Sequence, residues 1–148
     1  MVGGGTAVLE GWRSSTIDAD LYSDTAGIFD DIQGIKDRLD VNIEFVRPED
    51  FVPALAGSDA RHVFIEIVGR VSFFHYDPYA QLLSKVVRGF DRDMQDAKSF
   101  VESGMVETKR FRALVAAIPD ATYAKYPAVS RQAVLEAVDD FVSRIGET

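Results

Sequence analysis

The stretch MVGGGTAVLEGWRSSTIDADLYSD, residues 1–24, joins three glycines to two closely spaced carboxylates. Its segment TAVLEG predicts a short helix that begins at the glycines and ends at Gly11. STIDADLYS then alternates apolar and polar residues, and this period of two predicts a strand. Asp18 and Asp20 therefore share one face of the strand, about 7 Å apart along the chain.

The following segments predict a small α/β part over residues 1–76. Residues 27–40 carry apolar side chains at helical spacing, and residues 41–46, VNIEFV, alternate as a second strand. Residues 61–76 predict two further strands joined by a tight turn at Gly69-Arg70. We assign the aromatic side chains in and before these strands to the core, namely Trp12, Phe64, Phe73 and Phe74.

The second part of the chain, residues 77–148, reads as helical. Asp77-Pro78 suits a helix N-cap followed by proline at the first helical position. The patterns predict helices at about 78–88, 91–103, 107–117 and 130–145. The fold class is therefore α/β (α+β): a small mixed sheet with helices, followed by a C-terminal helical bundle packed on it as a single compact domain.

Composition limits the protein classes that fit. The chain has 148 residues, 47% of them hydrophobic and 27% charged, as in an ordinary globular domain. Its net charge of −8 does not favour nonspecific duplex binding. No apolar run could span a bilayer, and no secretory signal pattern is present. Cysteine is absent, which excludes disulfides and thiolate metal sites. We expect a cytoplasmic protein with no membrane partner.

The paired carboxylates indicate a metal site. Two carboxylates side by side repel each other, whereas a divalent cation between them reverses the sign of the interaction. Mg²⁺ prefers oxygen ligands and is usually held by a few carboxylates together with phosphate oxygens. Glu44 lies on the second predicted strand and can share the face of Asp18 and Asp20. Such a trio can activate an attacking oxygen and stabilise a leaving pyrophosphate.

The glycines supply the other half of the predicted site. Gly3, Gly4 and Gly5 allow the backbone to approach a ligand closely. They precede a helix, whose first N–H groups suit a phosphate, and the Thr6 hydroxyl can join them. The two histidines, His62 and His75, are too far apart in the sequence to indicate a metal pair, so we assign them structural roles.

This arrangement resembles the nucleotidyltransferases of the DNA polymerase beta-like superfamily. Their pattern is a hydrophobic residue, two small residues, about a dozen residues, Asp-x-Asp, and a later acidic residue on a neighbouring strand. Here it reads Val2-Gly3-Gly4, thirteen residues, Asp18-Ala19-Asp20-Leu21, and Ile43-Glu44-Phe45. The third acidic residue is Glu where many members have Asp. Relatives usually carry a helix and most of a strand before the glycines, so we expect the sheet edge to be completed differently here.

A closer resemblance is to the small prokaryotic nucleotidyltransferase-like proteins of toxin–antitoxin and abortive-infection loci. Those carry G-x-R-x-T-x-D-x-D-L, and this chain has GWRSSTIDADL, one residue longer between arginine and threonine. They also carry a helical K…R…(K/R)-D-x-x-D, matched here by SKVVRGFDRDMQD, residues 84–96. The resemblance spans residues 2 to about 103.

The resemblance implies Mg²⁺-dependent transfer of a nucleoside monophosphate from a nucleoside triphosphate to a hydroxyl of RNA or protein. It implies Asp18, Asp20 and Glu44 as metal ligands and catalytic residues. It further implies triphosphate contacts by Gly3, Gly4 and Thr6, positive partners for phosphate at Arg13 and Lys85, and an acidic residue implicated in activity at Asp93.

Two other functions stay open at this point. The first is a catalytically inactive binding module with the same fold, acting as an antitoxin or scaffold through protein contacts. The second is an RNA-binding accessory that uses the basic cluster Lys109, Arg110 and Arg112, for which a solvated helix face is the simpler interpretation. A cognate toxin or antitoxin partner and a homodimer are further open partners, because an unpaired edge strand invites association.

Overall fold

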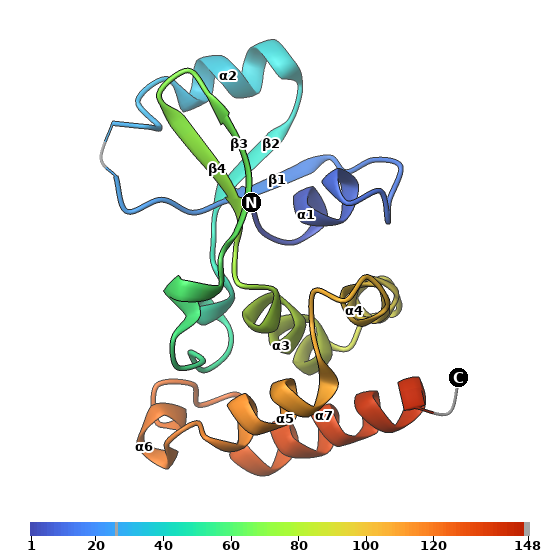
Figure 1. Cartoon of the computed structure of the whole chain (residues 1–148). Coiled ribbons are helices and arrows are strands. Elements are labelled where there is room, and N and C mark those ends of the chain that lie inside the picture. Colours follow the sequence, from blue (N-terminus) through green and yellow to red (C-terminus); the bar gives the residue numbers. More distant parts are fainter. Residues whose placement is uncertain (26, 147–148) are drawn as a thin grey trace. The chain divides into compact units, whose positions relative to one another are not determined.

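The computed structural model describes residues 1–25 and 27–146 (Figure 1). The fold is mixed α and β as predicted, with seven α-helices and two small sheets in this part of the chain. The chain forms two compact units, Met1–Arg47 with Phe64–His75, and Pro48–Val63 with Tyr76–Thr148. The second unit thus contains the loop segment that follows the second strand. The last two residues of the predicted helical part, 147 and 148, lie outside the described residues.

The first unit is built around a parallel pair of short strands. It contains α1 (Gly4–Leu9), β1 (Asp18–Leu21), α2 (Ile32–Leu39) and β2 (Asn42–Phe45). Strands β1 and β2 are parallel, with Asp18 opposite Asn42 and Asp20 opposite Glu44. The helix predicted from residue 27 begins only at Ile32, because Gly27 has a φ of 86° and the following residues form turns.

Residues 1–2 lie between β1 and β4 (Val71–His75) through backbone hydrogen bonds. The Val2 nitrogen donates to the Asp20 carbonyl oxygen at 2.9 Å, in an isolated antiparallel bridge. The Met1 nitrogen donates to the Phe74 carbonyl oxygen at 2.7 Å. The second edge of β1 is therefore bridged by the residue that directly precedes the glycines.

Strands β3 (Val63–Val68) and β4 form the predicted hairpin, with Gly69 at the turn in the left-handed region at φ 61°. The assignment of Phe64 and Phe74 to the core is wrong. Their exposed fractions are 55% and 40%, and their rings contact each other at a centroid distance of 5.6 Å. In a two-stranded hairpin with little cover, a cross-strand pair of rings shields itself in place of a core.

The second unit is helical, and its main helices begin and end within a residue or two of the predicted bounds. It contains the 3₁₀ turns Pro48–Asp50 and Ser58–Arg61, α3 (Pro78–Arg88), α4 (Asp91–Glu102), α5 (Thr108–Ala116), α6 (Asp120–Tyr123) and α7 (Arg131–Gly146). Its core is apolar and almost fully excluded from water, with Leu82, Leu83, Phe100, Phe111, Val115, Val134 and Val138 at 2% exposure or less. None of the described helices is long and apolar enough to cross a membrane.

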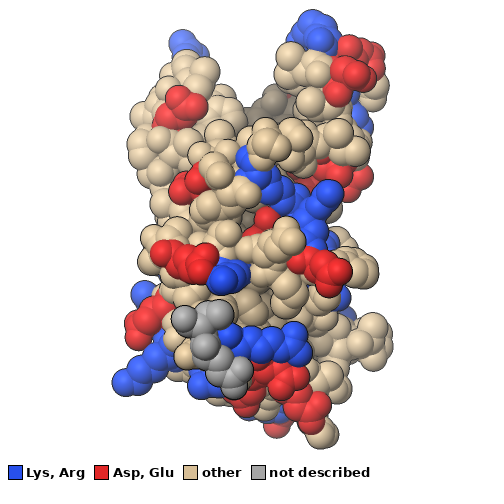
Figure 2. Space-filling view, turned by 90° about the vertical axis from the view of Figure 1, so that its right-hand side faces the viewer, with Lys and Arg blue, Asp and Glu red and all other residues tan. Residues whose placement is uncertain are grey.

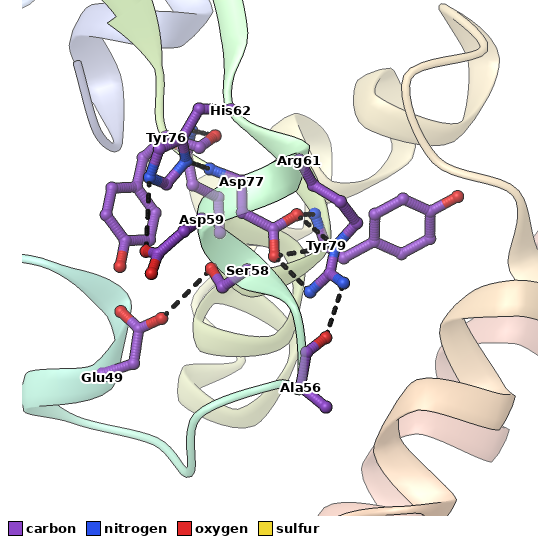
Figure 3. A network of polar contacts seen from close by, with 10 residues as sticks. Glu49, Ala56, Ser58, Asp59, Arg61, His62, Tyr76, Asp77 and Tyr79 are labelled. Carbon is purple, nitrogen blue, oxygen red and sulfur yellow. Dashed lines mark hydrogen bonds and ion pairs between the residues drawn. The ribbon is translucent and has the colours of Figure 1, made fainter.

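A buried polar network fixes the start of α3, as Figure 3 shows. Asp77 is the predicted N-cap, and its carboxylate accepts from the Tyr79 nitrogen at 3.0 Å. Arg61 donates to the same carboxylate, with its shortest contact at 2.6 Å, and also to the Ala56 carbonyl at 2.6 Å. The Asp77 nitrogen donates to Nδ1 of His62 at 2.9 Å. This network joins residues 56–62 to the helix and accounts structurally for His62.

Charges of both signs are interspersed on the surface in Figure 2. Several are paired, including Lys98 with Glu102 at 3.4 Å and Arg112 with Asp139 at 3.0 Å. The net charge of −8 is therefore not gathered into one acidic region of the face shown.

Candidate functional site

Four polar side chains share one face of the β1–β2 pair. The alternation along each strand and the parallel register place Asp18, Asp20, Asn42 and Glu44 together, with Asp18 beside Asn42 and Asp20 beside Glu44. We call these four residues the carboxylate face. Asp18, Asn42 and Glu44 are exposed and Asp20 is half-buried, so the face is open to a ligand. The predicted trio of acidic residues is thus brought together.

Asn42 joins two of the carboxylates across the strands. Its Nδ2 donates to Asp18 Oδ1 at 3.1 Å and to Glu44 Oε1 at 3.0 Å. The amide brings partial positive charge to a point where two negative groups would otherwise repel. Sequence reasoning did not select Asn42, although the alternation that selected Glu44 also placed Asn42 on that face.

The three glycines Gly3, Gly4 and Gly5, here called the glycine turn, pack directly against the carboxylate face. Gly3 has a φ of 59°, and a Cβ there would lie 2.8 Å from Asp20 Oδ2. A Cβ on Gly4 would lie 2.8 Å from Thr16 Oγ1 and 3.1 Å from Arg13 Nη1. Each of these distances is shorter than an ordinary van der Waals contact. The structure therefore brings Gly3 and Gly4 together with Asp20 and Arg13.

Thr6 follows the glycine turn, and its side chain points into the interior of the first unit. It is fully buried, and its Oγ1 lies 3.2 Å from Nδ1 of His75 and 3.4 Å from the Met1 carbonyl oxygen. The other ring nitrogen of His75 lies 2.7 Å from Glu10 Oε1. Burial lowers the pKa of His75 below its ordinary value, although the Glu10 carboxylate acts in the opposite direction. Contact of Thr6 with a triphosphate stays a prediction.

Lys85 and Asp93 belong to the second unit, where both are buried in an ion-pair cluster. Lys85 Nζ lies 2.7 Å from Asp96 Oδ2 and 3.6 Å from Asp93 Oδ1. Arg88 holds Asp93 with two contacts of 2.6 Å. Burial raises the pKa of Asp93, but the neighbouring Arg88 and Lys85 outweigh it and leave the pKa below its ordinary value. The charge of Lys85 is thus balanced within its own unit.

The carboxylate face suits Mg²⁺ by the chemistry of its donors. Carboxylate and amide oxygens are hard ligands, and Mg²⁺ is commonly held by one or two carboxylates plus substrate phosphates instead of a cage of protein ligands. Within residues 1–25 and 27–146, no three acidic, histidine or cysteine side chains converge as a preformed metal site. The residues therefore fit an ion that is completed by phosphate oxygens.

Two members of the basic cluster in α5 have partners within the chain. The Arg110 guanidinium lies over the Tyr79 ring, 5.3 Å from its centroid, and Arg112 pairs with Asp139. These contacts favour the solvated helix face over an RNA surface.

Comparison with known proteins adds one finding. No curated protein and no solved structure matches this chain. A family model described as "Nucleotidyltransferase of unknown function (DUF6036)" matches residues 1–145, nearly the whole sequence. The match covers the glycine turn, the carboxylate face and the Lys85 cluster, and it supports a general role in nucleotidyl transfer. The chain belongs to this family of nucleotidyltransferases.

Proposed function

We propose that this protein is a Mg²⁺-dependent nucleotidyltransferase that transfers a nucleoside monophosphate from a nucleoside triphosphate to a hydroxyl of RNA or protein. The observation that carries the proposal is the contact between Gly3 and Asp20, where a Cβ would lie 2.8 Å from the carboxylate oxygen. A turn suited to phosphate and a strand suited to metal are thereby parts of one site. The family assignment supports the same activity.

The carboxylate face would hold the metal through Asp18, Asp20 and Glu44. Bound Mg²⁺ neutralises phosphate charge and orients the triphosphate. Asn42 keeps Asp18 and Glu44 at a common position across the two strands, so the protein presents its oxygens before the ligand arrives.

The glycine turn and Arg13 would meet the triphosphate. Absence of side chains at Gly3 and Gly4 leaves the backbone N–H groups open to a phosphate oxygen. The Arg13 guanidinium beside Gly4 supplies a permanent positive charge. We include Lys85 and Asp93 in the proposed active site on the strength of the motif alone.

The transfer itself is an in-line displacement. The acceptor oxygen forms a bond to the α-phosphorus while the bond to the β-phosphate oxygen breaks, and pyrophosphate leaves. A carboxylate of the carboxylate face takes the acceptor proton, because acidic side chains are the bases that this face presents.

We further propose membership of the DNA polymerase beta-like superfamily and a place in a toxin–antitoxin pair, both on the motifs described above. One observation favours a second function, a catalytically inactive binding module. Lys85, expected to face phosphate, is 3% exposed and paired with two carboxylates. A module that acts through protein contacts needs no free cation there.

Calorimetric titration distinguishes the two functions. ATP, GTP, CTP and UTP, each with Mg²⁺, are titrated into wild type, into Asp18→Asn/Asp20→Asn, and into Asp30→Asn/Asp37→Asn. The last variant makes the same charge change at exposed positions of the first unit away from the carboxylate face. Metal-dependent binding that is lost only in the Asp18/Asp20 variant supports the enzyme. No binding of any triphosphate at millimolar concentration by folded wild type contradicts it and favours the binding module.

A further inference from the structure

Three side chains from two elements form a continuous polar chain beneath the glycine turn. Glu10 caps the C-terminus of α1, Thr6 lies within α1, and His75 ends β4. Nε2 of His75 lies 2.7 Å from Glu10 Oε1, and Nδ1 lies 3.2 Å from Thr6 Oγ1. Thr6 is fully buried and His75 is 3% exposed. Both ring nitrogens of a buried histidine are therefore engaged.

We propose that Glu10, His75 and Thr6 are positioning residues that hold the glycine turn in the conformation that binds a triphosphate. The inference rests on the proposed function, since it assigns these residues a role in that same site. None of the three is proposed to contact the ligand. They act through the backbone of the turn.

The chemistry of the partners sets the direction of each hydrogen bond. An ionised carboxylate only accepts, so Nε2 of His75 carries the proton and donates to Glu10. In the neutral ring Nδ1 is then an acceptor, and the Thr6 hydroxyl donates to it. Because Thr6 has a single hydroxyl proton, the Met1 carbonyl at 3.4 Å is the more distant of its two acceptors. The carboxylate thus selects the tautomer that holds the threonine.

The polar chain anchors the turn from one side while the strand bridge anchors it from the other. Val2, immediately before the turn, is bonded to Asp20, and Thr6, immediately after it, is bonded to His75. The Ala7 nitrogen closes the first helical bond onto the Gly3 carbonyl at 3.3 Å. Three consecutive glycines have unusual backbone freedom, so their conformation depends on these two anchors. Without the Thr6 hydroxyl, Nδ1 of His75 is left buried without a donor.

The test uses a matched set of threonine variants. Thr6→Val replaces the hydroxyl with a methyl group of the same shape, and Thr6→Ser keeps the hydroxyl. Ile43→Val is the stability control, because Ile43 is 8% exposed and lies on the face of β2 opposite Asn42 and Glu44. The four triphosphates with Mg²⁺ are titrated calorimetrically into each variant at pH 7.5, and thermal midpoints are recorded beside the affinities.

We expect Thr6→Val to weaken triphosphate binding about tenfold, the order expected for a buried group that loses its hydrogen bond. Thr6→Ser should recover most of that loss. Ile43→Val should lower the thermal midpoint and leave the affinity within about twofold of wild type. Rescue by serine together with an unaffected core control is a result that a merely structural role would not give.

The failures are distinguishable. If wild type binds and Thr6→Val binds equally well at a lower thermal midpoint, the polar chain is only structural and this inference is overturned alone. If wild type binds no triphosphate, the proposed function is overturned and this inference with it. Should Thr6→Val not fold, ¹⁵N spectra of the wild-type His75 ring decide: a proton on Nε2 with bare Nδ1 that shifts on triphosphate binding supports the inference, and the opposite tautomer or no shift overturns it.

Discussion

Gly3 and the Asp20 carboxylate are so close that no side chain fits between them. A Cβ on Gly3 would lie 2.8 Å from Asp20 Oδ2, and the backbone of Gly3 has a φ of 59°. The neighbouring Val2 is bonded to the Asp20 carbonyl oxygen. The turn that precedes α1 and the strand that follows it are thus fixed to each other at the residue we expect to bind metal.

Gly3→Ala should weaken triphosphate binding at least tenfold. The substitution imposes a left-handed backbone on alanine, at a cost of about 1–2 kcal/mol, and its methyl group displaces the Asp20 carboxylate. The matched control is Gly69→Ala, which has a similar φ of 61° and nothing within 4 Å of the added Cβ. Calorimetry should show lost affinity in the first variant only. Equal affinities would contradict a functional contact between Gly3 and Asp20.

Asn42→Asp should make the stability of the first unit depend on Mg²⁺. The change removes an amide that donates to Asp18 and Glu44 and adds a fourth negative charge to the carboxylate face. We expect a thermal midpoint a few degrees below wild type in EDTA and recovery of most of this difference in millimolar Mg²⁺.

The control for this variant is Gln33→Glu, since Gln33 also donates to a carboxylate, Asp37, at 2.9 Å on an exposed helix. It should show no recovery with Mg²⁺. A metal response of the same size in both variants would show that the carboxylate face has no special affinity for the ion.

His75 should give the first unit an acid-sensitive step. Its folded pKa lies below the ordinary value of 6.5, with burial as the largest cause. The unfolded chain therefore takes up the proton first as the pH falls, and stability decreases below about pH 6.5. Thermal midpoints at pH 7.5 and 5.5 should differ more in wild type than in His75→Gln, which has no group that titrates there. An equal difference in both proteins would assign the step to another residue.

Lys85→Met should destabilise the second unit strongly. It leaves Asp96, which is 2% exposed, without its 2.7 Å partner, and breaking a buried ion pair costs about 3–5 kcal/mol. Lys98→Met is the control, because Lys98 pairs with Glu102 at 3.4 Å on an exposed surface, where such a pair contributes about 0.3–0.5 kcal/mol. Urea unfolding should separate the two variants clearly. Similar midpoints would contradict a structural role for the Lys85 pair.

The sequence predicted the helices of the second unit well because their ends carry local signals. Asp77-Pro78 sets the start of α3, and Gly89, in the left-handed conformation at φ 72°, ends it. The start of α2 was predicted too early, since the apolar spacing of residues 27–31 does not reveal that Gly27 adopts a φ of 86°. Phe64 and Phe74 were misassigned because hydrophobicity alone does not indicate whether another element covers a strand.

The candidate site was predictable in part. Alternation along two strands placed Asp18, Asp20 and Glu44 on one face, but the contact of Asn42 with two of them depends on strand register, which the sequence does not encode locally. The partners of His75 depend on packing between residues more than sixty positions apart. Such contacts follow from the tertiary fold and not from the spacing of residues in one segment.

The most direct test of the account locates the metal and the triphosphate together. Mn²⁺ is added with a bound triphosphate to the ¹⁵N-labelled protein in place of Mg²⁺, and paramagnetic broadening of backbone amides is mapped. The account predicts that the amides of β1, of β2 and of the glycine turn broaden first, and that this broadening disappears in Asp18→Asn/Asp20→Asn. Broadening centred elsewhere in the first unit, or unchanged in that variant, would contradict a nucleotidyltransferase site at the carboxylate face.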